Sequence, residues 1–198
     1  NIDYCNKSGK TLLRWKISNK GQERATIIDF LGVTDMDASG YHTTINTVYP
    51  YEAKTISKSP IKRYVLTRDS LGYITSISYH ENNSNNIYSS RITDSNGIHK
   101  VVFENDSLGR IIVSTYYDLD GNVTKRKDGV AIMKYEYDDW GNISTLKFYS
   151  ASGKYTMNSR MYSKITNECD AWGNIVKEQF YDQNEKLCYN SDNAAQRI

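Results

Sequence analysis

Residues 137–143 read YDDWGNI and residues 169–175 read CDAWGNI, so the two stretches share one Asp-x-Trp-Gly-Asn-Ile pattern. Each leads into a polar–apolar run that ends in an aromatic pair, Phe148-Tyr149 or Phe180-Tyr181. Weaker copies give a series of matching glycines: Gly9, Gly40, Gly72, Gly109, Gly141 and Gly173. The differences between successive numbers in this series are 31, 32, 37, 32 and 32, and the long interval indicates an insertion around residues 82–96. A nearly constant period of this length predicts a tandem array of supersecondary units.

Two turn signals recur within these units. An Asp or Asn precedes each of these glycines by three residues, which is typical of a tight turn whose Gly adopts positive φ. A similar signal follows twelve residues after several of the glycines, at residues 18–21, 118–121 and 150–153, and in degenerate form at 182–185. The intervening runs have strand length, and none has a helical apolar period. We therefore predict an all-β fold in which residues 1–198 form one domain, an antiparallel sheet that twists or curls.

The strands expected around these turns carry apolar residues on both faces. The expected strands include residues 100–104, 134–137, 143–149 and 161–168, with a short extended piece at 155–158. Counted from the turn glycine, the second residue is Ile and the seventh is aromatic, at Ile74 and Tyr79, Ile111 and Tyr116, Ile143 and Phe148, and Ile175 and Phe180. These two positions face opposite ways in a regular strand. The pattern predicts either a β-bulge between the second and fifth positions or a strand covered on both faces.

The combination of aromatic strands and Asp-x-x-Gly-Asn turns, as in residues 117–122 (YDLDGN) and 134–142 (KYEYDDWGN), resembles a known repeat family. It is similar to the tyrosine–aspartate repeats, the YD or RHS-type repeats, of bacterial surface and toxin proteins. The resemblance covers residues 63–187 well and residues 1–60 loosely, and the period is longer than in typical shell-forming members. It implies an antiparallel β-repeat sheet, curled in large members, that serves secretion, adhesion or toxin delivery. Nothing here resembles their self-cleaving core or toxin tip, so the resemblance supplies no catalytic residue.

The composition fits a folded β protein without a highly charged partner. The chain has 198 residues, 12% of them aromatic, and its 17 Tyr favour half-buried sheet surfaces. The net charge of +2 does not favour nucleic acid as a partner. No apolar run approaches the roughly 20 residues that span a bilayer. Because repeat-like sequence begins within the first ten residues, we expect a segment of a longer protein, and unpaired strand edges predict edge-mediated homodimers.

Trp140 and Trp172 precede two of the turn glycines and have two interpretations. In the functional one, they form stacking platforms for sugar rings or bases, together with the repeated tyrosines Tyr117, Tyr149 and Tyr181. In the structural one, they pack one turn against the next. Leu71 and Leu108 occupy the same slot in other units, and this substitution favours packing.

Other candidate chemistry is better explained by structure. Residues 118–122 begin like a calcium loop, but the twelfth ligand position is Gly129, so a hairpin turn is expected. The short basic run 125–127 lies near tyrosines and suggests at most phosphate contacts. The histidines, His42, His80 and His99, are expected at surfaces or strand edges. The cysteines, Cys5, Cys169 and Cys188, match no metal pattern and are expected to be reduced packing residues, with a Cys169–Cys188 bridge as the alternative.

These observations favour a non-enzymatic β-repeat scaffold or binding segment of a bacterial exported or cell-surface protein. A protein or glycan surface ligand would suit it, and no metal, cofactor or catalytic residue is expected. One alternative is a carbohydrate-binding module that uses the repeated Trp and Tyr residues. The other is an enzyme whose site is assembled between repeats, which would require His, Cys or carboxylate groups to converge.

Overall fold

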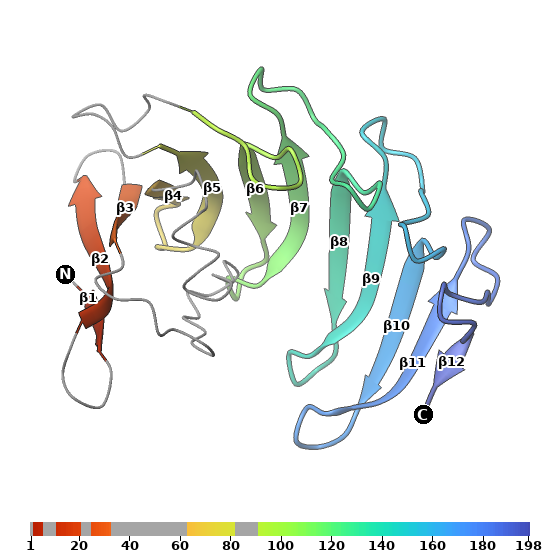
Figure 1. The fold of residues 1–198 in the computed structure, drawn as a ribbon. Helices are drawn as coiled ribbons and strands as arrows, with labels where there is room; N and C mark the ends of the chain where they lie inside the picture. The colour runs from red at the N-terminus through yellow and green to blue at the C-terminus, as the bar shows by residue number, and fades with distance from the viewer. Residues whose placement is uncertain (1, 6–10, 21–24, 33–62, 82–90) are drawn as a thin grey trace. The chain divides into compact units, whose positions relative to one another are not determined.

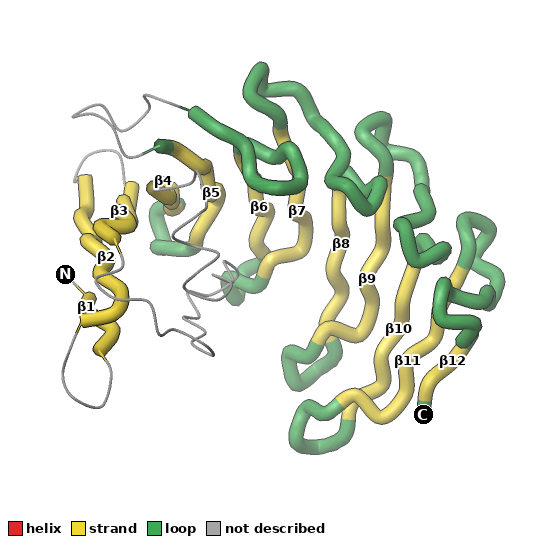
Figure 2. Tube along the Cα trace, in the orientation of Figure 1, coloured by secondary structure: helices red, strands yellow, loops and turns green. Residues whose placement is uncertain are grey.

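The computed structural model describes residues 2–5, 11–20, 25–32, 63–81 and 91–198, and these are all β, without a helix. Figures 1 and 2 show the strands as arrows and as yellow tube. The chain divides into two compact units, residues 1–94 and 95–198. The expectation of an all-β, antiparallel fold is confirmed for the described residues.

Unit 1 contains an antiparallel meander in which each strand pairs with the next in the chain. Its strands are β1 (Ile2–Cys5), β2 (Thr11–Lys20), β3 (Ala25–Gly32), β4 (Arg63–Arg68) and β5 (Ile74–His80). The prediction of a turn at residues 18–21 is wrong for residues 18–20. They belong to β2, because the ladder with β3 continues to the Lys20–Ala25 pair and uses their backbone groups. Gly9, Gly40 and His42 lie outside the described residues.

Unit 2 is a longer meander of the same kind. Its strands are β6 (Lys100–Asn105), β7 (Ile111–Tyr117), β8 (Ile132–Tyr137), β9 (Ile143–Tyr149), β10 (Lys164–Cys169), β11 (Ile175–Tyr181) and β12 (Gln196–Arg197). Neighbours in sequence are neighbours in space, and the sheet is open (Figure 1). The hairpins β6–β7, β8–β9 and β10–β11 therefore lie in sequence order along it.

A β-bulge follows the turns that precede β5, β7, β9 and β11, as one of the two sequence interpretations predicts. Glu136 pairs with Thr145, but the next residue, Tyr137, pairs with Ile143, so Ser144 is the extra residue. The same register shift occurs in β4–β5, β6–β7 and β10–β11. The bulge thus lies between the second and fourth positions after the glycine. It resolves the conflict between the Ile and aromatic positions, because it changes the alternation between them.

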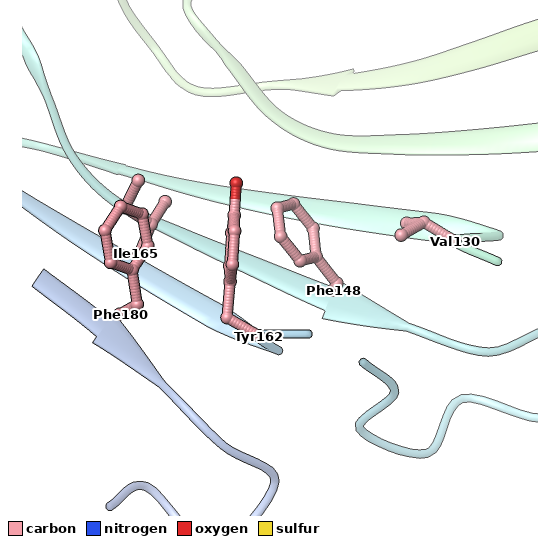
Figure 3. Close-up of a cluster of buried hydrophobic side chains, with 5 residues drawn as sticks. All are labelled: Val130, Phe148, Tyr162, Ile165 and Phe180. Atoms are coloured by element: carbon pink, nitrogen blue, oxygen red, sulfur yellow. The ribbon is translucent and has the colours of Figure 1, made fainter. Parts of the chain in front are cut away.

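The core of unit 2 is built from one face of the sheet and from segments that precede its strands. Phe148, Ile165 and Phe180 are buried on adjacent strands, and Tyr162 inserts between the two phenylalanines (Figure 3). Its ring centroid lies 5.7 Å from that of Phe148 and 4.9 Å from that of Phe180. Val130 completes the cluster. The seventh position after the glycine is therefore a core position here.

A third type of turn, absent from the sequence predictions, precedes β8, β10 and β12. It comprises residues 126–129, 158–161 and 190–193, and its fourth residue has positive φ whether it is Gly129, Met161 or Asn193. Successive copies are joined by backbone hydrogen bonds, from Ser159 N–H to the Asp128 carbonyl (2.8 Å) and from Ser191 N–H to the Arg160 carbonyl (2.9 Å). The strand expected at residues 161–168 is consequently shorter and begins at Lys164.

Candidate binding edge at the hairpin turns

One aspartate organises each hairpin turn. The Asp138 Oδ1 atom accepts hydrogen bonds from the backbone N–H groups of Trp140 (3.0 Å) and Asn142 (2.8 Å). The Gly141 N–H donates to the Asp138 carbonyl at 3.0 Å, and Gly141 has φ of 89°. The same bonds recur in the turns that begin at Asp69, Asp106 and Asp170. The predicted positive φ is confirmed at Gly72, Gly109, Gly141 and Gly173, the glycines of the series that the structure describes. The carboxylate satisfies backbone donors that would otherwise lack partners.

The second carboxylate oxygen locks the base of two of these turns. Asp138 Oδ2 accepts from Asn142 Nδ2, and Asp170 Oδ2 accepts from Asn174 Nδ2, both at 3.0 Å. These side-chain bonds, with the backbone bonds, lower the pKa of both carboxyls because they favour the charged form. Both turns therefore carry a fixed negative charge at neutral pH.

Trp140 and Trp172 project from these turns into solvent. Their side chains are 80% and 87% exposed, and Leu71 and Leu108, in the same slot, are 73% and 69% exposed. The interpretation that these residues pack one turn on the next is therefore wrong. The reason is geometric: the slot is the third turn position, at the outermost bend, where the side chain points away from the sheet.

The two Trp-bearing turns are nevertheless neighbours, because the Asn142 side chain of one lies against Gly173 of the other. A Cβ placed on Gly173 would lie 3.0 Å from Asn142 Oδ1, whereas one placed on Gly141 would meet nothing within 4 Å. The β8–β9 and β10–β11 hairpins are joined by pairing of β9 with β10, as in Thr166 with Thr145. Figure 1 shows their tips side by side. Each turn thus limits the movement of the other.

We call the surface formed by residues 138–143 and 170–176 the turn edge. Besides the two indoles it exposes Ile143, Ile175 and Val176. Ile143 and Ile175 immediately precede the extra residues of two β-bulges, where the ladder is interrupted, and Val176 is itself the extra residue of the second bulge. The turn edge therefore combines apolar and aromatic surface with the carboxylates of the turns.

The tyrosine candidates lie elsewhere. Tyr117, Tyr149 and Tyr181 end β7, β9 and β11, whereas the Trp-bearing turns precede β9 and β11. A seven-residue strand is about 20 Å long, so the tyrosines and the indoles occupy opposite ends of the hairpins. The structure separates the residues that the sequence analysis grouped as one set of platforms.

These tyrosines are half-buried in a network of cations and aromatic rings. The Lys134 ammonium lies 5.1 Å from the Tyr149 ring centroid, and the Lys164 ammonium lies 4.4 Å from that of Tyr181. Tyr155 stacks 4.8 Å from Tyr149 and donates its hydroxyl to a Glu185 oxygen at 3.2 Å. Burial, followed by the contact with Tyr149, raises the pKa of Tyr155. Because the rings of Tyr149 and Tyr181 are already engaged, these two tyrosines offer less free surface than the indoles.

A second polar cluster was missed by sequence reasoning. The Arg126 guanidinium donates to the Tyr116 hydroxyl at 3.1 Å and pairs with Asp128 at 3.2 Å, while Ser114 donates to the Tyr135 hydroxyl at 3.2 Å. Burial raises the pKa of Tyr116 to about 12. Arg126, considered above as a phosphate contact, is instead part of the internal packing of unit 2. Residues from different strands and turns form this cluster, so no local motif marks it.

His80 and His99 are buried, so the expectation of surface or strand-edge histidines is wrong for both. For His80 the burial is tolerated because its Nε2 atom lies 2.9 Å from Ser78 Oγ, which supplies a hydrogen-bond partner. Cys169 and Cys188 are free thiols. They contact opposite ends of β11, since Cys169 pairs with Ile175 and Cys188 donates its N–H to the Phe180 carbonyl. That separation, about 16 Å of strand, exceeds the reach of a disulfide.

Three further results bear on function. Within the residues that the structure describes, no cluster of three His, Cys, Asp or Glu could hold a metal ion, and no helix could cross a membrane. Asp118, in the calcium-loop-like stretch, caps a turn by accepting from the N–H groups of Asp120 (3.0 Å) and Asn122 (2.9 Å). No protein-family model and no curated protein matches the chain.

Proposed function

We propose that this chain is a non-enzymatic scaffold of tandem β-repeats, which presents a binding edge on an exported or cell-surface bacterial protein. The repeat is supported by Asp106, Asp138 and Asp170, which recur at equal intervals in the sequence and make the same turn bonds. The bacterial surface context is supported by the resemblance to YD or RHS-type repeats.

The exposure of Trp140 and Trp172 carries the binding role. Large aromatic side chains are mostly buried, and contiguous exposed apolar surface marks interaction sites. Unit 2 follows this rule at Phe148 and Phe180, which are buried, but departs from it at both indoles. A protein or glycan surface that covers the turn edge would remove these rings from water.

Four polar groups near the turns and in the core of unit 2 support a scaffold rather than an enzyme, because internal bonds already engage them. The turn carboxylates of Asp138 and Asp170 accept backbone N–H groups. The Tyr137 hydroxyl donates to the Ile111 carbonyl at 2.7 Å, and the Tyr116 hydroxyl accepts from Arg126. We therefore assign no catalytic residue.

The test is the attachment of the labelled chain to bacterial cells and isolated envelopes. Replacement of both indoles by leucine, Trp140→Leu with Trp172→Leu, retains a residue that Leu108 shows to be compatible with the turn. We expect the wild type to bind and the double variant to lose binding, while the control Leu108→Ala binds normally. Equal binding of the wild type and the double variant, or no binding by either, would contradict the proposal.

A further inference from the structure

The surroundings of the Met133 sulfur in unit 2 point to a modification site that is independent of the turn edge. We infer that Met133 is oxidised by hydrogen peroxide to its sulfoxide, and that the polar groups around the sulfur stabilise this oxidised form. These groups are the Tyr116 hydroxyl of β7, the Tyr135 hydroxyl of β8 and the Arg126 guanidinium of the turn before β8.

Three hydrogen-bond donors converge on this sulfur. The Tyr116 hydroxyl donates to Met133 Sδ at 3.1 Å. The Arg126 guanidinium and the Tyr135 hydroxyl also donate to it, with the nitrogen 3.6 Å and the oxygen 3.7 Å away. A thioether is only a weak acceptor, so one sulfur is a poor partner for three donors. The site lacks a strong acceptor.

Other hydrogen bonds direct the two hydroxyl protons towards the sulfur. A phenol carries one proton to donate, and its oxygen can also accept. The Tyr116 oxygen accepts from Arg126 at 3.1 Å. The Tyr135 oxygen accepts from Ser114 Oγ at 3.2 Å. Each phenol therefore keeps its own proton for the sulfur, and burial raises the pKa of Tyr116 to about 12, so that this hydroxyl remains a donor at neutral pH.

Oxidation of the thioether supplies the missing acceptor. A sulfur lone pair attacks one oxygen of hydrogen peroxide and the O–O bond breaks. The departing oxygen takes the remaining proton of the transferred oxygen and leaves as water, so the sulfur is oxidised by two electrons and the peroxide is reduced. The sulfoxide oxygen is a polar acceptor. Donors 3.6 and 3.7 Å from the sulfur leave space for it at a hydrogen-bond length of about 2.8 Å.

Oxidation at this position should stabilise unit 2 instead of damaging it. A sulfoxide usually disrupts the packing around a methionine, because it places a polar oxygen among apolar side chains. Met133 packs against the core cluster, but Tyr116 and Arg126 place polar groups at its sulfur. The new oxygen therefore replaces weak hydrogen bonds with stronger ones.

The first experiment is peroxide oxidation of a variant in which Met133 is the only methionine. Met36→Leu, Met157→Leu and Met161→Asn produce it, and Asn193 shows that asparagine is compatible with the turn position of Met161. Oxidation should raise the thermal midpoint by about 2–4 °C, the shift that one added hydrogen bond gives in a chain of this length. The same background with Met133→Leu controls for oxidation of other residue types, and its midpoint should not rise.

The second experiment uses the wild-type chain and the chirality of the sulfoxide. Tyr116 and Arg126 are hydrogen-bonded to each other, so they lie on the same side of the sulfur. We therefore expect one epimer in excess at Met133 and both epimers at Met157, which is 38% exposed. The oxidised chain is unfolded and treated with the two stereospecific methionine sulfoxide reductases, each of which reduces one epimer. Peptide mass spectrometry then measures the sulfoxide that remains at each position.

Three outcomes would overturn the inference. A midpoint that falls or stays constant when Met133 is oxidised in the single-methionine variant would show that its neighbours do not stabilise the sulfoxide. Equal amounts of the two epimers at Met133 would show that the donors do not hold its oxygen. A Met133 that stays reduced when Met157 is fully oxidised would exclude the modification itself. The last two results come from the wild-type chain, so they decide the inference even where the single-methionine variant does not fold.

Discussion

Substitution of Gly173 by alanine tests the contact between neighbouring turns, and Gly141→Ala is its matched control. Both glycines have positive φ, 82° and 89°, so an alanine at either site incurs the same left-handed strain of about 1–2 kcal/mol. Alanine also has fewer unfolded conformations than glycine, and this lower entropy of the unfolded state offsets about 0.4–1 kcal/mol of the strain. We therefore expect Gly141→Ala to destabilise unit 2 by about 1 kcal/mol, the balance of these two terms.

Gly173→Ala should cost more, because its Cβ would lie 3.0 Å from Asn142 Oδ1. The Asn142 side chain must then move and weaken its bond to Asp138, which adds about 1 kcal/mol. Urea denaturation followed by circular dichroism measures both variants. The expected difference between them is about 1 kcal/mol.

The double variants with Asn142→Ala identify the source of that difference. Without the Asn142 side chain, Gly173→Ala and Gly141→Ala should cost the same, because only the shared backbone strain remains. Equal costs in the wild-type background would refute the turn-to-turn contact. A difference that persists with Asn142→Ala would show that another neighbour causes it.

Three further predictions concern stability. Met161→Gly should raise the free energy of unfolding, measured in urea, by about 0.5–1 kcal/mol because Met161 has φ of 67° and glycine relieves that strain. Met157→Gly should lower it, because Met157 has no positive φ to relieve. The Asp138 pKa is lower in the folded state than its unfolded value of about 3.9, so its stabilisation is present above about pH 4 and is lost as the pH falls through the folded pKa. Asp138→Asn should therefore make the thermal midpoint less sensitive to acid below pH 4, and an unchanged pH profile would contradict this. Phe180→Ala should cost about 3–5 kcal/mol because it removes a large, fully buried side chain from the core. A smaller loss for Tyr181→Ala, on the opposite face of the strand, is the internal comparison.

Local features of this fold could be predicted from the sequence because few residues encode them. A turn such as 138–141 needs only an aspartate that accepts its own backbone N–H groups and a glycine that adopts positive φ. The bulge was one of two interpretations of the Ile143 and Phe148 positions, and the pairing of β8 with β9 decided between them. Strand ends were predicted less well where backbone pairing with a neighbouring strand replaced a local turn, as at residues 18–20.

The third turn could not be predicted because its local signal is degenerate. At residues 158–161 and 190–193 the glycine is replaced by Met161 and Asn193. Asparagine tolerates positive φ, but methionine rarely adopts it, so the residue types at this position show no common signal. Asn158 and Asn190 cap these two turns from within, as the aspartates do in the hairpin turns. Hydrogen bonds between successive copies add contacts with residues that are distant in the sequence.

The sequence by itself determined the β-hairpins, their order along the chain and the conformation of the turn glycines, because these depend on interactions within a few residues. Only the tertiary structure decided which aromatic residues are buried. Phe148 and Phe180 lie on the strand face that Tyr162 covers, whereas Trp140 and Trp172 lie at turn tips that no described segment covers. Burial depends on what packs against a side chain, and in this chain the covering residues come from other strands and segments. For that reason aromatic residues form both the core and the candidate binding edge.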